Sequence, residues 1–150
     1  MTTFSSPSEL AGSVGAHLGY SAWLEITQER IDAFADATDD HQWIHVDPEQ
    51  ARSGPFGTTI AHGYLTLSLA VRFTAEIFQV EGRVMGVNYG SNRVRFISPV
   101  PVGSKLRAGG TLAAVEEVPG GYQATIDLTF EIEGAEKPAC VAQVLYRMYV

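Results

Sequence analysis

Four carboxylates and two imidazoles fall within the twelve residues from Asp36 to Asp47. The densest part of this stretch reads Asp40-His41-Gln42-Trp43-Ile44-His45. A carboxylate and a neutral imidazole that share one water form an acid–base pair, because the carboxylate can orient or deprotonate the water and the imidazole can move a proton near neutral pH. The residues and their spacing are therefore suited to acid–base chemistry on a water, with Asp40 and His45 as the candidate groups.

Two other interpretations of this cluster stay open from the residues alone. Asp39 and Asp40 can simply end the preceding helix and bind solvent. His41, His45 and His62 with Asp40 can also supply metal ligands, although no cysteine joins them. We expect no metal and no cofactor.

A second segment, Thr58 to Tyr64, carries the chemistry of a helix start. Gly63 is placed at the amino-terminal end of a predicted helix, directly after Ala61 and His62. The first N–H groups of a helix have no internal partner, and glycine lets a ligand approach them closely. Such a place suits a carbonyl oxygen that gains negative charge. The alternative is that Gly63 only makes room for a crossing strand.

The elements that must position these residues change character near residue 82. Before it, the patterns predict a short helix at 8–14, a brief strand at 21–25, a helix at 28–37 capped by Thr27, a helical turn at 47–51, an irregular loop at 53–57 and a long helix at 63–78 that is apolar nearly all round. After it, we expect strands at 83–97, 105–118, 122–133 and 139–149, with turns at 119–121 and 133–138. One buried helix followed by antiparallel strands predicts an α+β fold in which the sheet curls round the helix.

Length and charge limit the classes of function. A chain of 150 residues buries about two-thirds of its surface, enough for one core, so we expect a single domain over residues 1–150. The formal net charge of −7 disfavours nucleic-acid binding. The first residues are polar, and the longest apolar stretch, 64–80, contains Arg72 and Glu76, so we expect neither a signal peptide nor a membrane span and predict a cytoplasmic protein. The one cysteine, Cys140, excludes an internal disulfide.

These motifs resemble the MaoC-like (R)-specific enoyl-CoA hydratases over residues 20–148. The hydratase motif of that family, Asp-x-Asn-Pro-hydrophobic-His, five residues and then a small residue, is similar to the stretch from Asp40 to His45 followed by Ala51. The family's His-Gly at its central helix resembles His62-Gly63. Its Arg-Phe, Pro-Val and Gly along the next strand resemble 95–96, 99–100 and Gly103.

The sequence departs from that motif at three positions. Gln42 and Trp43 stand where the family has Asn and Pro, and Asp39 stands where a glycine is common. The string Asp-His-Gln-Trp-Ile-His instead resembles the NodN-like branch of the same family. These departures leave Asp40 and His45 in place and change the side chains that lie between them in the sequence.

The resemblance implies a hot-dog fold and a homodimer that binds acyl-CoA at or near the subunit interface. It implies reversible addition of water to a trans-2-enoyl-CoA to give an (R)-3-hydroxyacyl-CoA. Asp40 would activate the water, His45 would shuttle the proton, and the Gly63 N–H would hold the thioester oxygen. Substrate contacts are expected from the neighbours of these residues and from the next strand: Gln42, Trp43, Ala61, His62, Ser68 and Arg93.

Other assignments stay open at this point. Ser68 falls where the family has a serine that supports the aspartate, or it merely packs a helix. The CoA phosphates have four basic candidates, each of which can equally be a surface charge or a structural ion pair: Arg72, Arg93, Arg95 and Lys105. An acyl-CoA thioesterase on the same fold and a non-catalytic acyl-CoA-binding subunit are the rival functions.

Overall fold

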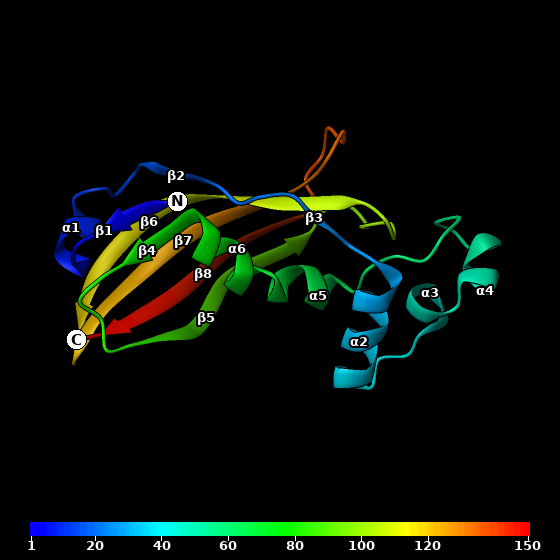
Figure 1. Ribbon diagram of the computed structural model, residues 1–150, viewed down its shortest axis with the longest axis horizontal. Helices are drawn as coiled ribbons and strands as arrows, with labels where there is room; N and C mark the ends of the chain where they lie inside the picture. Colours follow the sequence, from blue (N-terminus) through cyan, green and yellow to red (C-terminus); the bar gives the residue numbers. More distant parts are fainter.

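The computed structural model describes all residues, 1–150. Its main feature is a six-stranded sheet in which every neighbouring pair is antiparallel, in the order β2-β6-β7-β8-β5, with β3 also paired to β6 (Figure 1). The strands are β2 (His17–Tyr20), β3 (Leu24–Glu25), β5 (Met85–Phe96), β6 (Lys105–Val118), β7 (Gly121–Ile132) and β8 (Cys140–Tyr149). The four strands predicted after residue 82 are confirmed, with small shifts at their ends.

One face of the sheet is apolar because side chains alternate along each strand. In β7 the residues Ala124, Ile126, Leu128 and Phe130 are all buried. A helical segment lies against this face, and Phe73 from it packs 6.1 Å from the Phe130 ring, centroid to centroid. The core therefore sits between this segment and the sheet, as the α+β prediction requires.

The predicted long helix is present as two consecutive pieces, α5 (Gly63–Ser68) and α6 (Ala70–Ile77), which meet at Leu69. Backbone hydrogen bonds continue across the junction, since the Leu69 N–H donates to the Leu65 carbonyl and the Phe73 N–H to the Leu69 carbonyl. The expectation of burial nearly all round is wrong for this chain. Tyr64 is 69% exposed and Val71 57% exposed, because the sheet covers only one side of the helix.

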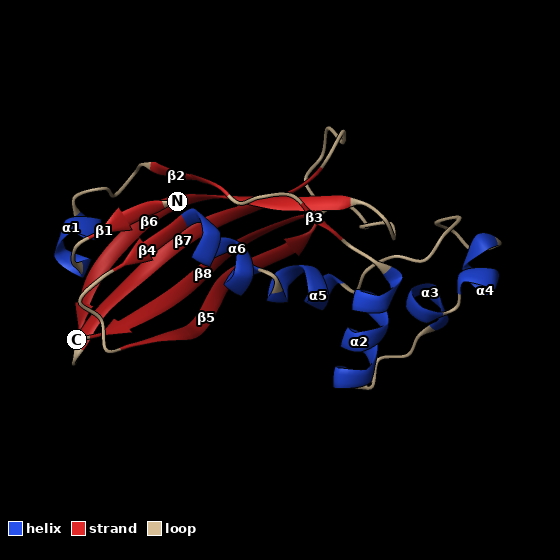
Figure 2. Ribbon diagram, viewed as in Figure 1, coloured by secondary structure: helices blue, strands red, loops and turns tan.

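The remaining elements lie at the two ends of this helical segment (Figure 2). They are β1 (Thr2–Phe4), which pairs in parallel with β4 (Phe78–Val80), and the helices α1 (Pro7–Ala11), α2 (Gln28–Thr38), α3 (Trp43–Val46) and α4 (Pro48–Arg52). The predicted cap of α2 is confirmed, because Thr27 accepts from the Arg30 N–H; Asp47 caps α4 in the same way by accepting from the Gln50 N–H. The strand predicted at 21–25 is present only as β3, and helix α3 was missed.

Helix α2 ends at Asp39 in the left-handed conformation, with φ 58° and ψ 22°. Glycine adopts this conformation without strain, while most other residues lose about 1–2 kcal/mol there. We therefore expect Asp39→Gly to be as stable as the natural protein or more stable. Asp39→Val should unfold at a clearly lower urea concentration than Asp39→Gly. Its free energy of unfolding should be about 1–2 kcal/mol smaller. Equal midpoints for the two variants would show that the conformation carries no strain.

Candidate active site

Helices α2, α3 and α4 lie beyond the end of the sheet on the side where α5 starts (Figure 1), with α3 in contact with both α2 and α4. Asp40 follows the left-handed cap of α2 and is exposed. Its carboxylate Oδ1 accepts a long hydrogen bond, 3.5 Å, from the Gln42 N–H. The short helix α3 carries His45, which is 7% exposed. The chain thus presents a solvated carboxylate next to a buried imidazole.

The hydrogen bond of His45 fixes its tautomer. Nδ1 lies 2.7 Å from the Ile60 carbonyl oxygen, which can only accept, so Nδ1 carries the proton. The other nitrogen, Nε2, has no partner in the protein and keeps contact with solvent. In the neutral ring Nε2 is therefore a proton acceptor.

His62, remote in sequence, completes the cluster. Its ring stacks on the His45 ring with centroids 3.9 Å apart and an interplanar angle of 24°. Its Nε2 lies 3.0 Å from the Asp40 carbonyl oxygen and must donate there. Asp40, His45 and His62 each bring a polar side-chain atom within 4.8 Å of the others. The two sequence segments that carry the candidate residues thus lie side by side in the structure.

Backbone and side-chain contacts hold α3 in place. The Ile60 N–H donates to the Ile44 carbonyl at 3.0 Å, next to the bond from His45. Gln28 of α2 donates from Nε2 to the His45 carbonyl at 2.8 Å, and its Oε1 accepts from Thr59 at 2.6 Å. Sequence reasoning missed Gln28 and Ile60. Ile60 contributes its backbone carbonyl, and a pattern of side chains does not predict which backbone carbonyl will bond to a histidine.

Burial lowers the pKa of His45 below its ordinary value of 6.5, while the bond to Ile60 and the nearby Asp40 act in the other direction. Repulsion from a charged His62 lowers it further. His45 is therefore neutral near neutral pH. A solvated carboxylate beside a neutral ring nitrogen can hold one water between them and move its protons.

This lowered pKa predicts a pH dependence of folding stability. The unfolded chain takes up a proton at His45 near pH 6.5, before the folded chain does. The contribution of His45 to the free energy of unfolding is therefore fully present above that pH and falls as the pH drops toward the pKa of His45 in the folded protein. His45→Gln should remove this part of the slope in urea unfolding between neutral and mildly acid pH.

The exposed His41 must be removed as a confounder. Its pKa is raised, mainly by the hydrogen bond to Asp36, so it contributes stability that is present at low pH and lost as pH rises. We therefore expect the slope from His45 to be clearest when His41→Gln is compared with His41→Gln/His45→Gln. Identical pH slopes in these two proteins would contradict the assignment.

The geometry of the same three residues does not suit a tetrahedral metal. The rings of His45 and His62 are stacked nearly parallel, so the lone pairs in their planes run side by side rather than converging. An ion bound to both nitrogens would have to lie well out of each ring plane, where imidazole does not bind metals well. The arrangement fits a water better than an ion.

Gly63 is the first residue of α5, and no side chain caps that helix. A Cβ on Gly63 would lie 2.8 Å from the ring of Phe96, so the glycine also makes room for β5. Both interpretations of this glycine therefore find support in the geometry. Ala61 is buried, and its N–H donates to the Val100 carbonyl at 2.8 Å.

The remaining predicted contacts are spread more widely. Gln42 is exposed at the start of α3, and Trp43 is half-buried against Gly54, where a Cβ would lie 2.8 Å from its ring. Ser68 donates its hydroxyl to the Tyr64 carbonyl at 2.6 Å and makes no bond to Asp40. The structure does not bring Ser68 to the carboxylate.

The four basic candidates divide into two pairs. Arg72 forms an ion pair with Glu76 at 3.1 Å, and Lys105 lies 3.5 Å from Glu133. Arg93 and Arg95 are exposed on β5 and pair with no carboxylate. The two arginines of β5 are thus the cations left free for an anionic ligand.

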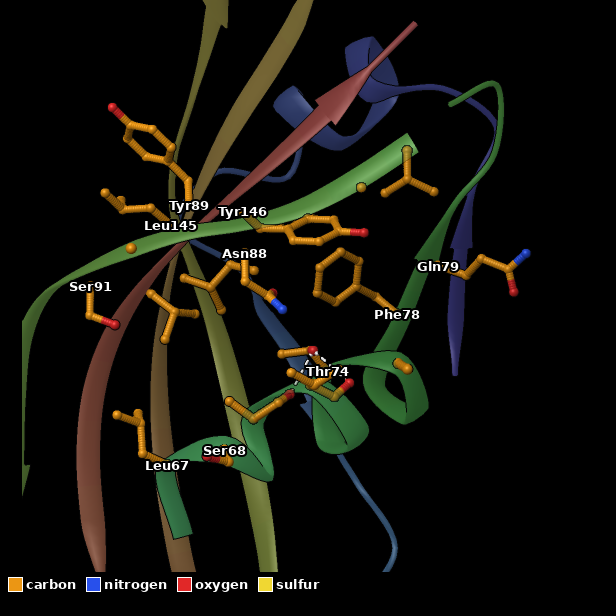
Figure 3. A pocket seen from close by; sticks show the side chains of 18 of the residues that line it. Leu67, Ser68, Thr74, Phe78, Gln79, Asn88, Tyr89, Ser91, Leu145 and Tyr146 are labelled. Carbon is orange, nitrogen blue, oxygen red and sulfur yellow. Dashed lines mark hydrogen bonds between the residues drawn. The ribbon is translucent and has the colours of Figure 1, made fainter. Parts of the chain in front are cut away.

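A groove of about 450 Å³ runs beside the exposed face of α5 and α6 (Figure 3). Side chains of the two helices lie on one side and those of β5 and β8 on the other, among them Leu67, Thr74, Tyr89 and Tyr146. Asp40, His45 and His62 do not line it. The groove and the cluster of Asp40, His45 and His62 meet α5 at opposite ends, since His62 directly precedes that helix and Ser68, its last residue, lines the groove. None of the helices combines the length and the hydropathy that a transmembrane helix needs.

Comparison with known proteins agrees with this arrangement. Residues 9–128 match the MaoC like domain. The 3-hydroxyacyl-thioester dehydratase Z of Mycobacterium tuberculosis (strain H37Rv) is 53% identical over 98% of both chains. Nodulation protein N of Rhizobium leguminosarum is 44% identical over 91% of this chain and 87% of its own.

A solved structure extends the comparison to the fold. The R-hydratase PhaJ1 of Pseudomonas aeruginosa superimposes with a TM-score of 0.77 at 22% identity, over 96% of this chain and 85% of the other. The hot-dog fold and the hydro-lyase class of enzyme, both predicted above, are confirmed. The chain therefore belongs to the MaoC-like family of hydratases and dehydratases, with NodN among its relatives.

Proposed function

We propose that this protein is an (R)-specific enoyl-CoA hydratase that reversibly adds water to a trans-2-enoyl-CoA. The observation that carries the proposal is the exposed Asp40 carboxylate within 4.8 Å of the ring nitrogens of two buried histidines, of which His45 has a lowered pKa. The 3-hydroxyacyl thioester in the name of the mycobacterial relative is the product of this hydration.

The proposed reaction needs only the atoms of water and the thioester. As the water oxygen bonds to C3, the C2–C3 π electrons move toward the thioester carbonyl and form an enolate. Asp40 takes one proton from the water, this proton passes to the unprotonated Nε2 of His45, and His45 delivers it to C2, so that one water is added and both side chains return to their starting state. The Gly63 N–H, at the uncapped start of α5, stabilises the enolate oxygen.

Two features near this centre support an acyl-CoA substrate. The groove along α5 and α6 is lined mainly by apolar side chains and accommodates an acyl chain. A six-residue helix is about 9 Å long, so a chain whose thioester lies at Gly63 reaches the groove after passing α5. Arg93 and Arg95 offer unpaired charges for the CoA phosphates.

The product formed from one enoyl-CoA tests the proposal. We expect purified protein to yield 3-hydroxyacyl-CoA without releasing free CoA thiol. Release of thiol with no hydroxyacyl product would identify a thioesterase. Thermal stabilisation by the enoyl-CoA without any turnover would identify a binding subunit, because a ligand stabilises the folded state whether or not it reacts. Either result would overturn the hydratase.

We also propose that the chain forms a homodimer through β5. This strand is at the edge of the sheet, runs for 12 residues, and is exposed along almost its whole length. It carries large apolar side chains that solvent reaches, including Val87 and Tyr89. A long unpaired edge of this kind pairs readily with another strand, and a second copy offers the same edge in the antiparallel direction.

We expect the protein to sediment as a dimer at micromolar concentration and Val87→Lys to sediment as a monomer, because a lysine on an edge strand opposes pairing. Val14→Lys is the matched control, since Val14 is 50% exposed but lies outside β5. A wild-type monomer, or a dimer in the Val87→Lys variant, would contradict pairing through β5.

A further inference from the structure

His62 is placed where it touches both proposed catalytic residues but is shielded from substrate. Only 2% of it is exposed. One face of its ring stacks on His45 at 3.9 Å, and the Phe34 ring lies 4.9 Å away. Its Nε2–H is used by the Asp40 carbonyl. A side chain enclosed in this way cannot grip the substrate, contrary to the substrate contact expected from the sequence.

We propose that His62 is a positioning residue, which ties the Asp40 main chain to the start of α5 and orders the His45 ring by stacking on it. This inference rests on the proposed function, because it assigns Asp40 and His45 their roles. The bond from His62 is the only side-chain hydrogen bond that joins Asp40 to the start of α5, and His62 immediately precedes Gly63. His62 therefore sets the distance between Asp40 and the Gly63 N–H that is proposed to bind the enolate oxygen.

An unsatisfied atom supports a role beyond stability. Because Nε2 carries the proton of neutral His62, Nδ1 is an acceptor, and it is the one buried side-chain polar atom without a partner. A buried polar atom left unpaired costs stability. Phenylalanine would fill the same space and stack on His45 without that cost. The presence of histidine is thus better explained by what its donor does for Asp40 than by packing.

The stacked rings also influence each other's charge. A proton on His62 disfavours a proton on His45, since two like charges would lie 3.9 Å apart, centroid to centroid. The ionisable groups that act on His45 are His62 and Asp40. The other two groups that form hydrogen bonds with His45 are the side-chain amide of Gln28 and the carbonyl of Ile60, and neither carries a charge.

Two variants separate the hydrogen bond from the ring. His62→Phe keeps a ring for stacking and removes the donor to Asp40. His62→Gln keeps an N–H donor and removes the ring. We expect His62→Phe to melt at or above the wild-type temperature yet lose roughly tenfold to a hundredfold in kcat, because small displacements of catalytic groups have effects of this size. KM should stay the same, since His62 does not touch substrate. His62→Gln should recover part of kcat.

The titration of His45, followed by NMR without substrate, supplies a readout that a merely structural role would not move. We expect its pKa to rise in His62→Gln, because the repelling partner is gone, and to stay unchanged in the matched control His41→Gln. The acid limb of kcat/KM should move to higher pH in parallel.

Three results would overturn the inference: wild-type kcat in His62→Phe, a raised KM with unchanged kcat, or an unmoved His45 titration in His62→Gln. Failure of the proposed function would show itself differently, as wild-type protein that does not hydrate enoyl-CoA. The NMR titration can be read in either case.

Discussion

Asp40→Asn is expected to lower kcat for enoyl-CoA hydration by roughly 10²–10⁴, the span of general acid–base catalysis. The amide keeps the shape of the side chain but cannot take a proton from water. Because Asp40 is exposed and makes only one long hydrogen bond through its carboxylate, the melting temperature should stay close to that of the natural protein. KM should change little, since the carboxylate does not hold the CoA.

His45→Gln should lower kcat over the same range, because glutamine can donate to the Ile60 carbonyl but cannot titrate. This variant should also melt at lower temperature, since His45 is buried and stacked on His62. The double variant should be scarcely slower than the slower single variant, because two groups that act on one water fail together. His41→Gln is the control with wild-type kcat, as His41 is exposed and bound only to Asp36.

Gly63→Ala is the second change with a large expected effect, a fall in kcat of roughly 10²–10³, the loss seen when an oxyanion donor is disturbed. The added methyl group would lie 2.8 Å from the Phe96 ring, so this variant is also expected to lose stability. Phe96 is 47% exposed and can be removed without opening a large cavity.

The double variant Gly63→Ala/Phe96→Ala separates these two effects. It relieves the clash, so the melting temperature should recover relative to Gly63→Ala. The loss of kcat should persist, because the methyl group remains where the thioester oxygen approaches the helix start. Phe96→Ala alone is the matched control. Recovery of both stability and kcat in the double variant would show that Gly63 serves only to admit β5.

The strands were predictable because their patterns are local. Alternation from Ala124 to Phe130 reports burial of one face directly, and Pro119-Gly120 marks a turn, where Gly120 has a φ of 81°. The burial of the central helix was not predictable in the same way. Apolar residues occur on every side of this helix, so the sequence pattern does not tell which side the sheet covers. Val71 is apolar and yet exposed.

The same limit applies to the site. Asp40 and His45 are five positions apart, so their proximity follows from the chain. Gly63 was a candidate because the sequence predicted that a helix begins there. The stacking of His62 on His45 depends on how α3 packs against the segment before α5, and nothing local in the sequence reports it. Ser68 shows the converse, because its place in a motif did not bring its hydroxyl to Asp40.

The most direct test of the central claim is the product made from a trans-2-enoyl-CoA by wild-type protein and by Asp40→Asn/His45→Gln, with chiral analysis of the 3-hydroxyacyl-CoA. We predict that the wild-type protein forms the (R) product and that the double variant, folded and able to bind CoA thioester, loses roughly 10²–10⁴ in kcat. A double variant that forms the (R) product at the wild-type rate would show that the water is activated elsewhere.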